Sequence, residues 1–387
     1  TPLEAANNIN MNTLALQGEC GIMDPIAPGI RPGSDTSHLS ILGYDPYKAY
    51  TGRGPFEAAG IGMDVRKGDI ALRCNFSTVD ESMVIVDRRA GRIEKGTDQL
   101  AALVNGMQIE DVTAFFKESV AHRGALVLRG PGLGAAVTDA DPHEVGAKVH
   151  ESKPIDPNDQ ASAKTARIVN EFVRRSYQLL KDHPVNKQRE AEGKALANII
   201  LPRGAGVAPH VESFEEKYHL KGAAVVETGL IGGIAVYLGM DIVEASGATG
   251  GLDSDLMSMG RSVLKALENH SFVLCNLKGP DVAGHDGQAK AKVEVIERID
   301  AVVGMLMQEV DPLTYIVLTA DHSTPISVMD HSGDPVPIAI WGPDVRVDSI
   351  QAYDERSVIG GGLVRIKGTD VMPTLTNLLG TQEKFGA

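Results

Sequence analysis

The stretch Asp281-Val282-Ala283-Gly284-His285 follows an apolar run at 272–277 that has the composition of a buried β-strand. In open α/β sheets, ligands bind beyond the carboxyl ends of the strands. An Asp and a His four residues apart in such a loop can converge on one cation. The same pattern also fits a helix-capping Asp followed by a surface His. Taken alone, this stretch leaves metal binding and a structural role both open.

Two further strand ends carry the same kinds of side chain. Asp321 and His322 directly follow a second apolar run, and His331 precedes a third. Each could be structural by itself, because a lone His is more often structural than a metal ligand. Together with 281–285, however, three separate loops present Asp or His. Carboxylate and imidazole suit Zn²⁺ or Mn²⁺ and leave positions open for a substrate. Two such ions about 4 Å apart can clamp an in-line phosphoryl transfer.

The order of elements around these loops predicts an α/β fold. From Gly222 onward, short apolar runs alternate with helical segments, including a long amphipathic helix at 288–310. That alternation indicates a mostly parallel sheet with helices on both faces. The middle of the chain instead resembles an α+β layer, with strands and helices less regularly alternated. We therefore predict a core made of 1–61 and 185–387, with an inserted α+β domain at 62–184.

Composition narrows the functional classes. The 387 residues carry a formal charge of −14 and only 4% aromatic residues, which disfavours nucleic-acid and anionic-membrane binding. A run of about 18 apolar residues is absent, and so is a basic-then-apolar leader, so we expect neither a membrane span nor secretion. The three cysteines are far apart and fit no disulfide framework. We expect a cytoplasmic protein that acts on a small molecule. The sequence leaves its oligomeric state open, a homo-oligomer included.

A candidate nucleophile lies early in the chain. Pro32-Gly33-Ser34-Asp35-Thr36 precedes an apolar segment, which places Ser34 at the start of a helix. A helix N-terminus favours bound phosphate. A serine hydroxyl ionises too weakly at neutral pH to attack by itself, and a bound divalent ion can supply the missing acidity. A plain helix-capping serine is the alternative, but the metal-binding loops make Ser34 the candidate nucleophile.

Taken together, these motifs resemble the alkaline-phosphatase superfamily and, within it, the cofactor-independent phosphoglycerate mutases of the archaeal type. The resemblance extends over the whole chain. It is carried by Gly33-Ser34-Asp35-Thr36-Ser37-His38-Leu39-Ser40, Gly52-Arg53-Gly54, Asp87-Arg88-Arg89-Ala90-Gly91-Arg92, Asp281-Val282-Ala283-Gly284-His285, Asp321-His322-Ser323-Thr324-Pro325, His331-Ser332-Gly333-Asp334-Pro335-Val336-Pro337 and the terminal Glu383-Lys384-Phe385-Gly386-Ala387.

The resemblance implies an isomerase of glycolysis and gluconeogenesis that interconverts 3-phosphoglycerate and 2-phosphoglycerate without 2,3-bisphosphoglycerate. The reaction would pass through a phosphoserine at Ser34. Two divalent ions are implied, Mn²⁺ before the alternatives Zn²⁺, Co²⁺ and Mg²⁺. The implied ligands are Asp281, His285 and His331 for one ion, and Asp321, His322 and Ser34 for the other.

The family has one more metal-ligand Asp, in an Asp-Gly pair at the end of its first strand. That pair is absent from this sequence, which opens with Thr1 rather than Met. We expect the sequence to begin downstream of the native start. Without the upstream Asp, we expect the second metal site to bind weakly.

A mutase must also hold the phosphate and the carboxylate of its substrate, and arginine binds both groups bidentately. The predicted substrate-binding residues are Arg88, Arg89, Arg92, His122, Arg123, Asp141, His143, Arg203 and Lys221. Each arginine could instead be a solvated surface residue, and Asp141 with His143 could form a capped turn. Closure of the inserted domain would retain the glycerate and exclude water. We therefore interpret the insertion as the part that separates a mutase from a phosphatase.

Two other functions fit parts of this pattern. Another phosphatase or phosphomutase of the superfamily, such as a phosphopentomutase, would share the metal loops, because one fold and one metal site serve several chemistries. The arginine-rich segment 87–92 favours phosphoglycerate over these substrates. A degenerate, non-catalytic homologue would bind only metal or a phosphorylated metabolite, but the nucleophile and five candidate metal ligands are present.

Overall fold

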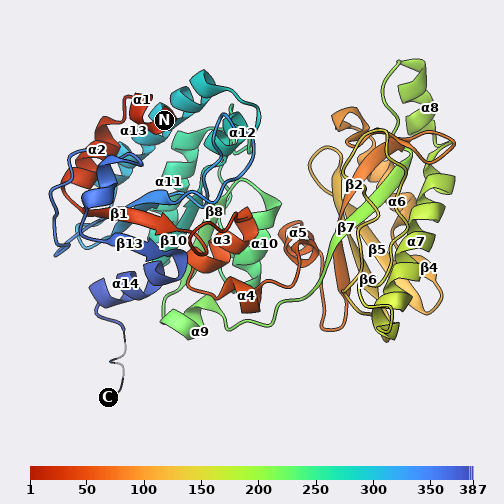
Figure 1. The fold of residues 1–387 in the computed structure, drawn as a ribbon, viewed down its shortest axis with the longest axis horizontal. Helices are drawn as coiled ribbons and strands as arrows, with labels where there is room; N and C mark the ends of the chain where they lie inside the picture. The colour runs from red at the N-terminus through yellow and green to blue at the C-terminus, as the bar shows by residue number, and fades with distance from the viewer. Residues whose placement is uncertain (383, 385, 387) are drawn as a thin grey trace. The chain divides into compact units, whose positions relative to one another are not determined.

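The structure is a computed structural model that describes every residue except 383, 385 and 387. The chain forms two compact units, one made of Thr1–Tyr50 and Val211–Ala387 and the other of Thr51–His210 (Figure 1). The terminal motif at 383–387 therefore lies partly outside the described residues. Within the described part of the chain, we find no helix that combines the length and the apolar composition needed to cross a membrane.

The first unit contains two β-sheets. The strands of the larger sheet follow the order β11 (Ile316–Thr319), β12 (Val336–Trp341), β1 (Glu19–Asp24) and β13 (Val364–Lys367). The smaller sheet has the order β10 (Phe272–Asn276), β8 (Gly222–Val226) and β9 (Asp241–Ile242), and its strands are all parallel.

The predicted α/β fold is confirmed, although one strand makes the larger sheet mixed. β12 runs antiparallel to both β11 and β1, whereas β1 and β13 are parallel. The connection from β11 to β12 contains no helix. A parallel pair would need a crossover connection that is usually helical, whereas an antiparallel partner can be reached by a loop. The loop that carries His331 therefore also reverses the chain direction.

Helices surround these sheets. They are α1 (Pro2–Ala5), α2 (Ile9–Leu16), α3 (Ser34–Ile41), α4 (Pro46–Ala49), α9 (Phe214–Tyr218), α10 (Gly229–Tyr237), α11 (Leu256–Leu267), α12 (Gly279–His285), α13 (Ala289–Glu309) and α14 (Val371–Leu378), with 3₁₀ turns η2 (Ser357–Gly360) and η3 (Gly368–Asp370). The long amphipathic helix predicted at 288–310 is α13. Its apolar stripe buries Ile296 and Val303 in a core shared with α2 and β12.

A cavity of about 1830 Å³ lies alongside β10 and β11. Within the described residues, β10 pairs only with β8, and β11 pairs only with β12. The side chains of both strands line the cavity and are only half-buried. Asp281, Asp321 and His322 line it as well, so the loops that follow the two strands border the same space.

The second unit is built on one antiparallel sheet. Its strands are β2 (Ile70–Val79), β3 (Ile85–Asp87), β4 (Met107–Ile109), β5 (Val112–Glu118), β6 (Arg123–Arg129) and β7 (Ile199–Val207), in the order β3-β2-β6-β5-β4 with β7 also paired to β2. The helices of this unit are α5 (Arg53–Gly60), α6 (Thr97–Val104), α7 (Gln160–Leu180) and α8 (Pro184–Ala191), with the 3₁₀ turn η1 (Ala90–Arg92).

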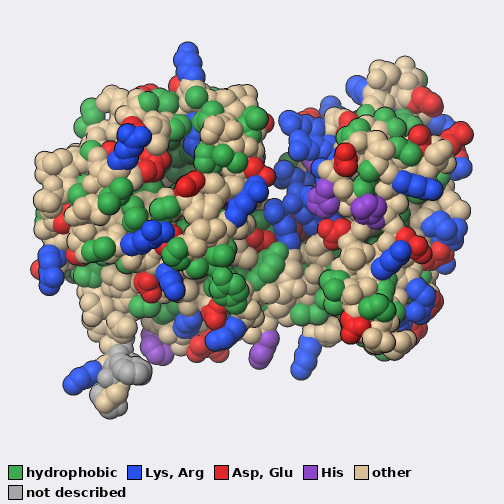
Figure 2. Space-filling model, viewed as in Figure 1, with side chains coloured by type: hydrophobic (Ala, Val, Ile, Leu, Met, Phe, Trp, Pro, Cys, Tyr) green, Lys and Arg blue, Asp and Glu red, His purple; other side chains and the backbone are tan. Residues whose placement is uncertain are grey.

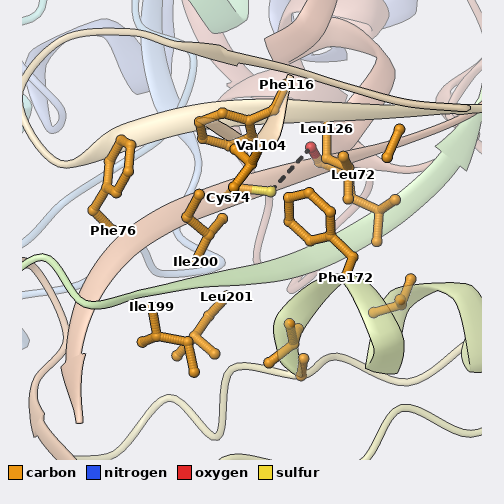
Figure 3. Close-up of a cluster of buried hydrophobic side chains, with 14 of the residues drawn as sticks. Leu72, Cys74, Phe76, Val104, Phe116, Leu126, Phe172, Ile199, Ile200 and Leu201 are labelled. Atoms are coloured by element: carbon orange, nitrogen blue, oxygen red, sulfur yellow. Dashed lines mark hydrogen bonds between the residues drawn. The ribbon is translucent and has the colours of Figure 1, made fainter. Parts of the chain in front are cut away.

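The two faces of this sheet are covered differently. On one face, Cys74 and Phe116 pack with Phe172 of α7 in the main core (Figure 3). On the other face, Ala58 of α5 packs against small side chains such as Ala71. Because side chains alternate along a strand, residues 71, 73 and 75 of β2 share the face that α5 covers, while 72, 74 and 76 enter the main core.

The predicted insertion at 62–184 lies wholly within the second unit. The predicted core boundaries differ from the observed ones, because 51–61 and 185–210 were placed in the core and belong to the second unit. The second of these segments contains β7, which pairs antiparallel with β2 from Ile199 to Val207. The sequence pattern shows that 197–201 is apolar and extended, but its partner strand lies more than a hundred residues away in the chain.

Candidate active site

Helix α12 presents Asp281 and His285 on one face, since they are four residues apart. The loop before β12 brings in His331. One ligand atom from each of these residues lies within 4.8 Å of the others. Asp281 Oδ1 is 3.4 Å from His285 Nε2 and 3.6 Å from His331 Nε2. A carboxylate between two imidazoles is a donor set that fits a divalent transition-metal ion.

Backbone carbonyls orient both of these histidines. His331 Nδ1 lies 2.8 Å from the carbonyl oxygen of Pro32, and His285 Nδ1 lies 3.1 Å from that of Met329. Donating Nδ1–H to a backbone oxygen leaves Nε2 as the free acceptor, which faces Asp281 in both cases. Metal-binding histidines are commonly fixed in this way.

The remaining predicted residues join the same cluster. α3 begins at Ser34, after Gly33 as its N-cap, and the buried Ser34 Oγ lies 2.9 Å from His322 Nε2. The same nitrogen is 3.2 Å from Asp321 Oδ2, and His322 Nδ1 is 3.9 Å from Asp281 Oδ1. The structure therefore brings Ser34 and all five predicted Asp and His ligands together.

Electrostatics favour the metal-binding protonation states of Asp281, Asp321 and His331. Burial raises the pKa of Asp281, but Lys278 and a hydrogen bond from Thr324 outweigh it and hold that pKa below its usual range. For Asp321, the effect of burial is likewise outweighed, mainly by His322, so its pKa is lowered. Burial lowers the pKa of His331, with His322 adding to the effect. A metal ion binds the ionised form of a carboxylate and the neutral form of an imidazole.

Sequence reasoning missed three side chains that support this cluster. Lys278 Nζ lies 2.6 Å from Asp281 Oδ2, and Thr324 Oγ1 donates to Asp281 Oδ1 at 2.7 Å. His38 Nδ1 lies 2.7 Å from the carbonyl oxygen of Ser34 and 3.6 Å from Asp321 Oδ2. The i,i+3 spacing of Lys278 and Asp281 could have revealed the first of them. The contacts of His38 depend on tertiary packing.

The second unit carries a cluster of arginines that we call the arginine face. It comprises Arg53, Arg73, Arg89, Arg92, Arg123 and Arg203, together with His122. Figure 2 shows Lys and Arg side chains gathered on one side of this unit, with histidines beside them. Burial, reinforced by Arg123 and Arg89, lowers the pKa of His122 to about 4, so this imidazole is neutral at pH 7. The site has the charge and the donors to bind an anion.

A second group of predicted residues borders the arginine face. Arg88 contacts the buried Asp141 through two nitrogens, with Nη2 3.0 Å from Oδ2 and Nε 3.4 Å from Oδ1. Arg203 Nη1 lies 3.2 Å from His143 Nδ1, and its Nε is 3.9 Å from Asp141 Oδ2. Asp139 accepts from the backbone N–H of Gly204 at 2.8 Å. These residues therefore form one connected network rather than separate surface groups.

Lys221 does not join the other predicted residues. It precedes β8, which runs parallel to β10, whereas Asp281 follows the far end of β10. Its ammonium is half-exposed and lies 3.7 Å from Asp241 Oδ2. A strand of five residues spans about 16 Å, so Lys221 lies at the opposite end of the smaller sheet from the metal-binding cluster.

Sequence reasoning also missed Arg53, Arg73 and Glu57 of the second unit. Glu57 Oε1 lies 3.0 Å from Arg53 Nε and 3.5 Å from Arg73 Nη1. The Gly52-Arg53-Gly54 motif pointed to Arg53 without giving it a role. Arg73 is an arginine directly after the apolar run 70–72 of β2, and that was the signal that could have identified it.

Comparison with known proteins assigns the family. Residues 15–186 match the sequence profile of 2,3-bisphosphoglycerate-independent phosphoglycerate mutase, and 207–334 match that of type I phosphodiesterase / nucleotide pyrophosphatase. The mutases of this name from Methanothermobacter thermautotrophicus and Methanocaldococcus jannaschii are 56% and 50% identical, over all of this chain and 95% and 94% of their own lengths.

Solved structures agree with the sequence matches. A protein from Pyrococcus horikoshii has a TM-score of 0.86 at 37% identity, with 100% of this chain and 93% of that one covered. The cofactor-independent phosphoglycerate mutase of Thermoplasma acidophilum has a TM-score of 0.70 at 38% identity, with 98% and 93% covered. The chain therefore belongs to the 2,3-bisphosphoglycerate-independent phosphoglycerate mutases.

Proposed function

We propose that this isomerase interconverts 3-phosphoglycerate and 2-phosphoglycerate through a phosphoserine formed at Ser34. Family membership supports the overall isomerisation. The observation that carries the proposed route is the position of Ser34, whose Oγ lies 2.9 Å from His322 Nε2 at the start of α3. A hydroxyl at a helix N-terminus and beside a metal-binding cluster is suited to accept a phosphoryl group.

We propose that the cluster binds two divalent ions, and the Asp281, His285 and His331 group supports the first of these sites. Asp281, His285 and His331 would hold one ion, and Asp321, His322 and Ser34 would hold the other. The mixture of carboxylate and imidazole suits Mn²⁺, with Zn²⁺, Co²⁺ and Mg²⁺ as alternatives. Bound ions would make the Ser34 hydroxyl more acidic and neutralise charge on the phosphoryl oxygens.

Ser34 would act in two displacements. The Ser34 hydroxyl loses its proton and Oγ attacks phosphorus; the new P–Oγ bond forms as the bond to the glycerate 3-oxygen breaks, and that oxygen takes up a proton. In the second step, the glycerate 2-hydroxyl loses its proton and attacks the phosphoserine. The P–Oγ bond breaks as the bond to the 2-oxygen forms, Oγ takes up a proton, and 2-phosphoglycerate leaves. Between the two steps the glycerate must stay bound while water is excluded, or the enzyme would act as a phosphatase.

We assign the retention of glycerate to the second unit. The arginine face offers guanidinium donors, and Arg88 and Arg203 are linked through Asp141 to the same network. A glycerate carboxylate can accept two parallel hydrogen bonds from one guanidinium. The positive charge of this face and its buried donors support the assignment.

A coupled assay tests the proposed function. The chain is supplied with 3-phosphoglycerate and Mn²⁺, without 2,3-bisphosphoglycerate, and formation of 2-phosphoglycerate is followed through enolase. Turnover should be accompanied by phosphate on the peptide that contains Ser34 when the reaction is quenched in acid. If none of the four metals supports turnover, the assignment of mutase activity is overturned. Turnover without labelling of that peptide, even in rapid-quench samples, would overturn the route through Ser34.

A further inference from the structure

Three neighbouring strands of the second unit place arginines on one face of the sheet. Arg73 on β2 is directly opposite Arg203 on β7, and Asn75 on β2 is directly opposite Arg123 on β6. Residues directly opposite each other in an antiparallel pair share a face, and 73 and 75 share a face by alternation. All three arginines therefore lie on the face that α5 partly covers.

Glu57 of α5 holds two of the arginine-face side chains. Its Oε1 lies 3.0 Å from Arg53 Nε, one helical turn earlier, and 3.5 Å from Arg73 Nη1 on the sheet. The Glu57 and Arg73 side chains are only 16% and 13% exposed. Burial raises the pKa of Glu57, but Arg73 and Arg53 outweigh it and hold the pKa below its usual range. The carboxylate is therefore ionised and offsets part of the repulsion among the guanidiniums.

Hydrogen-bond donors remain unused around this carboxylate. Arg73 Nε and Arg203 Nε are buried and make no hydrogen bond within the described residues, and the same is true of Nδ1 of the 7%-exposed His122. Buried polar groups are nearly always hydrogen-bonded in native proteins. Two buried guanidinium Nε atoms that make no hydrogen bond, on one face and opposite each other in register, are donors that the oxygens of an anionic ligand can use.

We propose that Glu57 is a positioning residue that fixes Arg53 and Arg73 as a carboxylate-binding subsite of the arginine face. This inference rests on the proposed function, because the substrate carries two anionic groups and Ser34 takes the phosphoryl group. The carboxylate then needs cationic donors of its own. Arg73 is suited to that role because Glu57 contacts its Nη1 and leaves its Nε free.

The test uses three probes that separate carboxylate from phosphate recognition. These are 3-phosphoglycerate as substrate, D-glycerate as a carboxylate-only competitor and glycerol 3-phosphate as a phosphate-only competitor. The main variant is Glu57→Gln, which keeps the side-chain shape and removes the charge. Arg73→Met removes the guanidinium, and the exposed Glu81→Gln serves as a matched control in the same unit. Thermal unfolding is recorded for each variant.

We expect Glu57→Gln to raise KM for 3-phosphoglycerate by about tenfold to a hundredfold, as a lost charged hydrogen bond does. The value of kcat should change less than KM, binding of D-glycerate should weaken in parallel, and inhibition by glycerol 3-phosphate should stay within about twofold. Arg73→Met should show the same selectivity, and Glu81→Gln should match the parent. A role of Glu57 in folding alone would lower thermal stability without this selectivity.

Two results would overturn the inference while leaving the proposed function intact. The first is an active enzyme in which Glu57→Gln and Arg73→Met both leave KM and D-glycerate binding unchanged. The second is weakened inhibition by glycerol 3-phosphate instead of D-glycerate, which would assign these arginines to the phosphate. Binding of D-glycerate is measured by calorimetry and needs no turnover. An inactive parent enzyme would therefore count against the proposed function and not against the subsite.

Discussion

Replacing Asp281 by Asn should remove the effect of metal on thermal stability. Asp281 Oδ1 is within 3.4, 3.6 and 3.9 Å of nitrogens from His285, His331 and His322 respectively. It is therefore the carboxylate that both proposed metal sites adjoin. The amide retains an oxygen but loses the charge, and only the charged form neutralises a divalent ion.

The size of the effect follows from linkage. An ion at a free concentration 100 times its Kd stabilises the folded state by about 2.7 kcal/mol. For a domain of about 150–250 residues, each kcal/mol shifts Tm by roughly 2–4 °C. Saturating Mn²⁺ should therefore raise the Tm of the parent chain by about 5–10 °C. The same addition should raise the Tm of Asp281→Asn by less than about 2 °C.

Differential scanning calorimetry with and without Mn²⁺, after chelation and dialysis, measures both shifts. Asp286→Asn is the matched control, since Asp286 is exposed and directly follows the same helix. It should keep the full shift of the parent. An equal metal-induced shift in Asp281→Asn and in the parent would refute the reasoning, because the cluster would then not be where the metal binds.

Three further outcomes are expected. Ser34→Ala should lower mutase activity by at least about 10³-fold, since no other nucleophile replaces it, while Mn²⁺ still raises Tm; activity within tenfold of the parent would contradict the route. Replacing Arg88, Arg89 and Arg92 together by Met should raise phosphate release relative to isomerisation, as measured by free phosphate against 2-phosphoglycerate; unchanged partitioning would count against retention of glycerate by these arginines. Asp141→Asn should cost about 3–5 kcal/mol of unfolding free energy at pH 7, because it leaves Arg88 without its buried partner. Burial raises the pKa of Asp141, but Arg88 outweighs burial, so the pKa in the folded state is lowered. The stabilisation by the Arg88–Asp141 pair is therefore fully present above about pH 4. It is lost as the pH falls through the folded-state pKa. The unfolding free energies of Asp141→Asn and the parent, measured with urea, should therefore differ at pH 7, and the difference should shrink as the pH falls below about 4. A difference that does not depend on pH would argue against an ionic contribution.

Local patterns were sufficient to predict several elements and to select the Asp and His residues that the structure brings together, whose role as metal ligands stays a prediction. The apolar run at 272–277 contains β10, and the amphipathic helix expected at 288–310 is α13. Asp281 and His285 could be paired from their spacing alone, because four residues make one turn of α12. The rule that ligands bind beyond strand ends pointed to the loops after β10 and β11, although these two strands belong to different sheets.

Long-range pairing set the limit of these predictions. The segment 197–201 was placed in the predicted core, whereas it leads into β7 of the second unit, because its partner β2 lies far away in the chain. Lys221 resembled a site residue by its position beside a strand, but it precedes the strand rather than following it, and this places it at the wrong end. Glu57 had no distinguishing sequence context at all.

The sequence by itself placed the candidate Asp, His and Ser residues in short motifs, and the four-residue spacing of Asp281 and His285 fixes their geometry within α12. Only the tertiary structure decided how the arginines are used. Arg73 and Arg203 face each other because β2 and β7 pair in one register, and a shift of one residue would turn Arg73 into the apolar core. The register between β2 and β7 depends on packing and hydrogen bonding between segments that are distant in the chain, so local sequence patterns do not predict it.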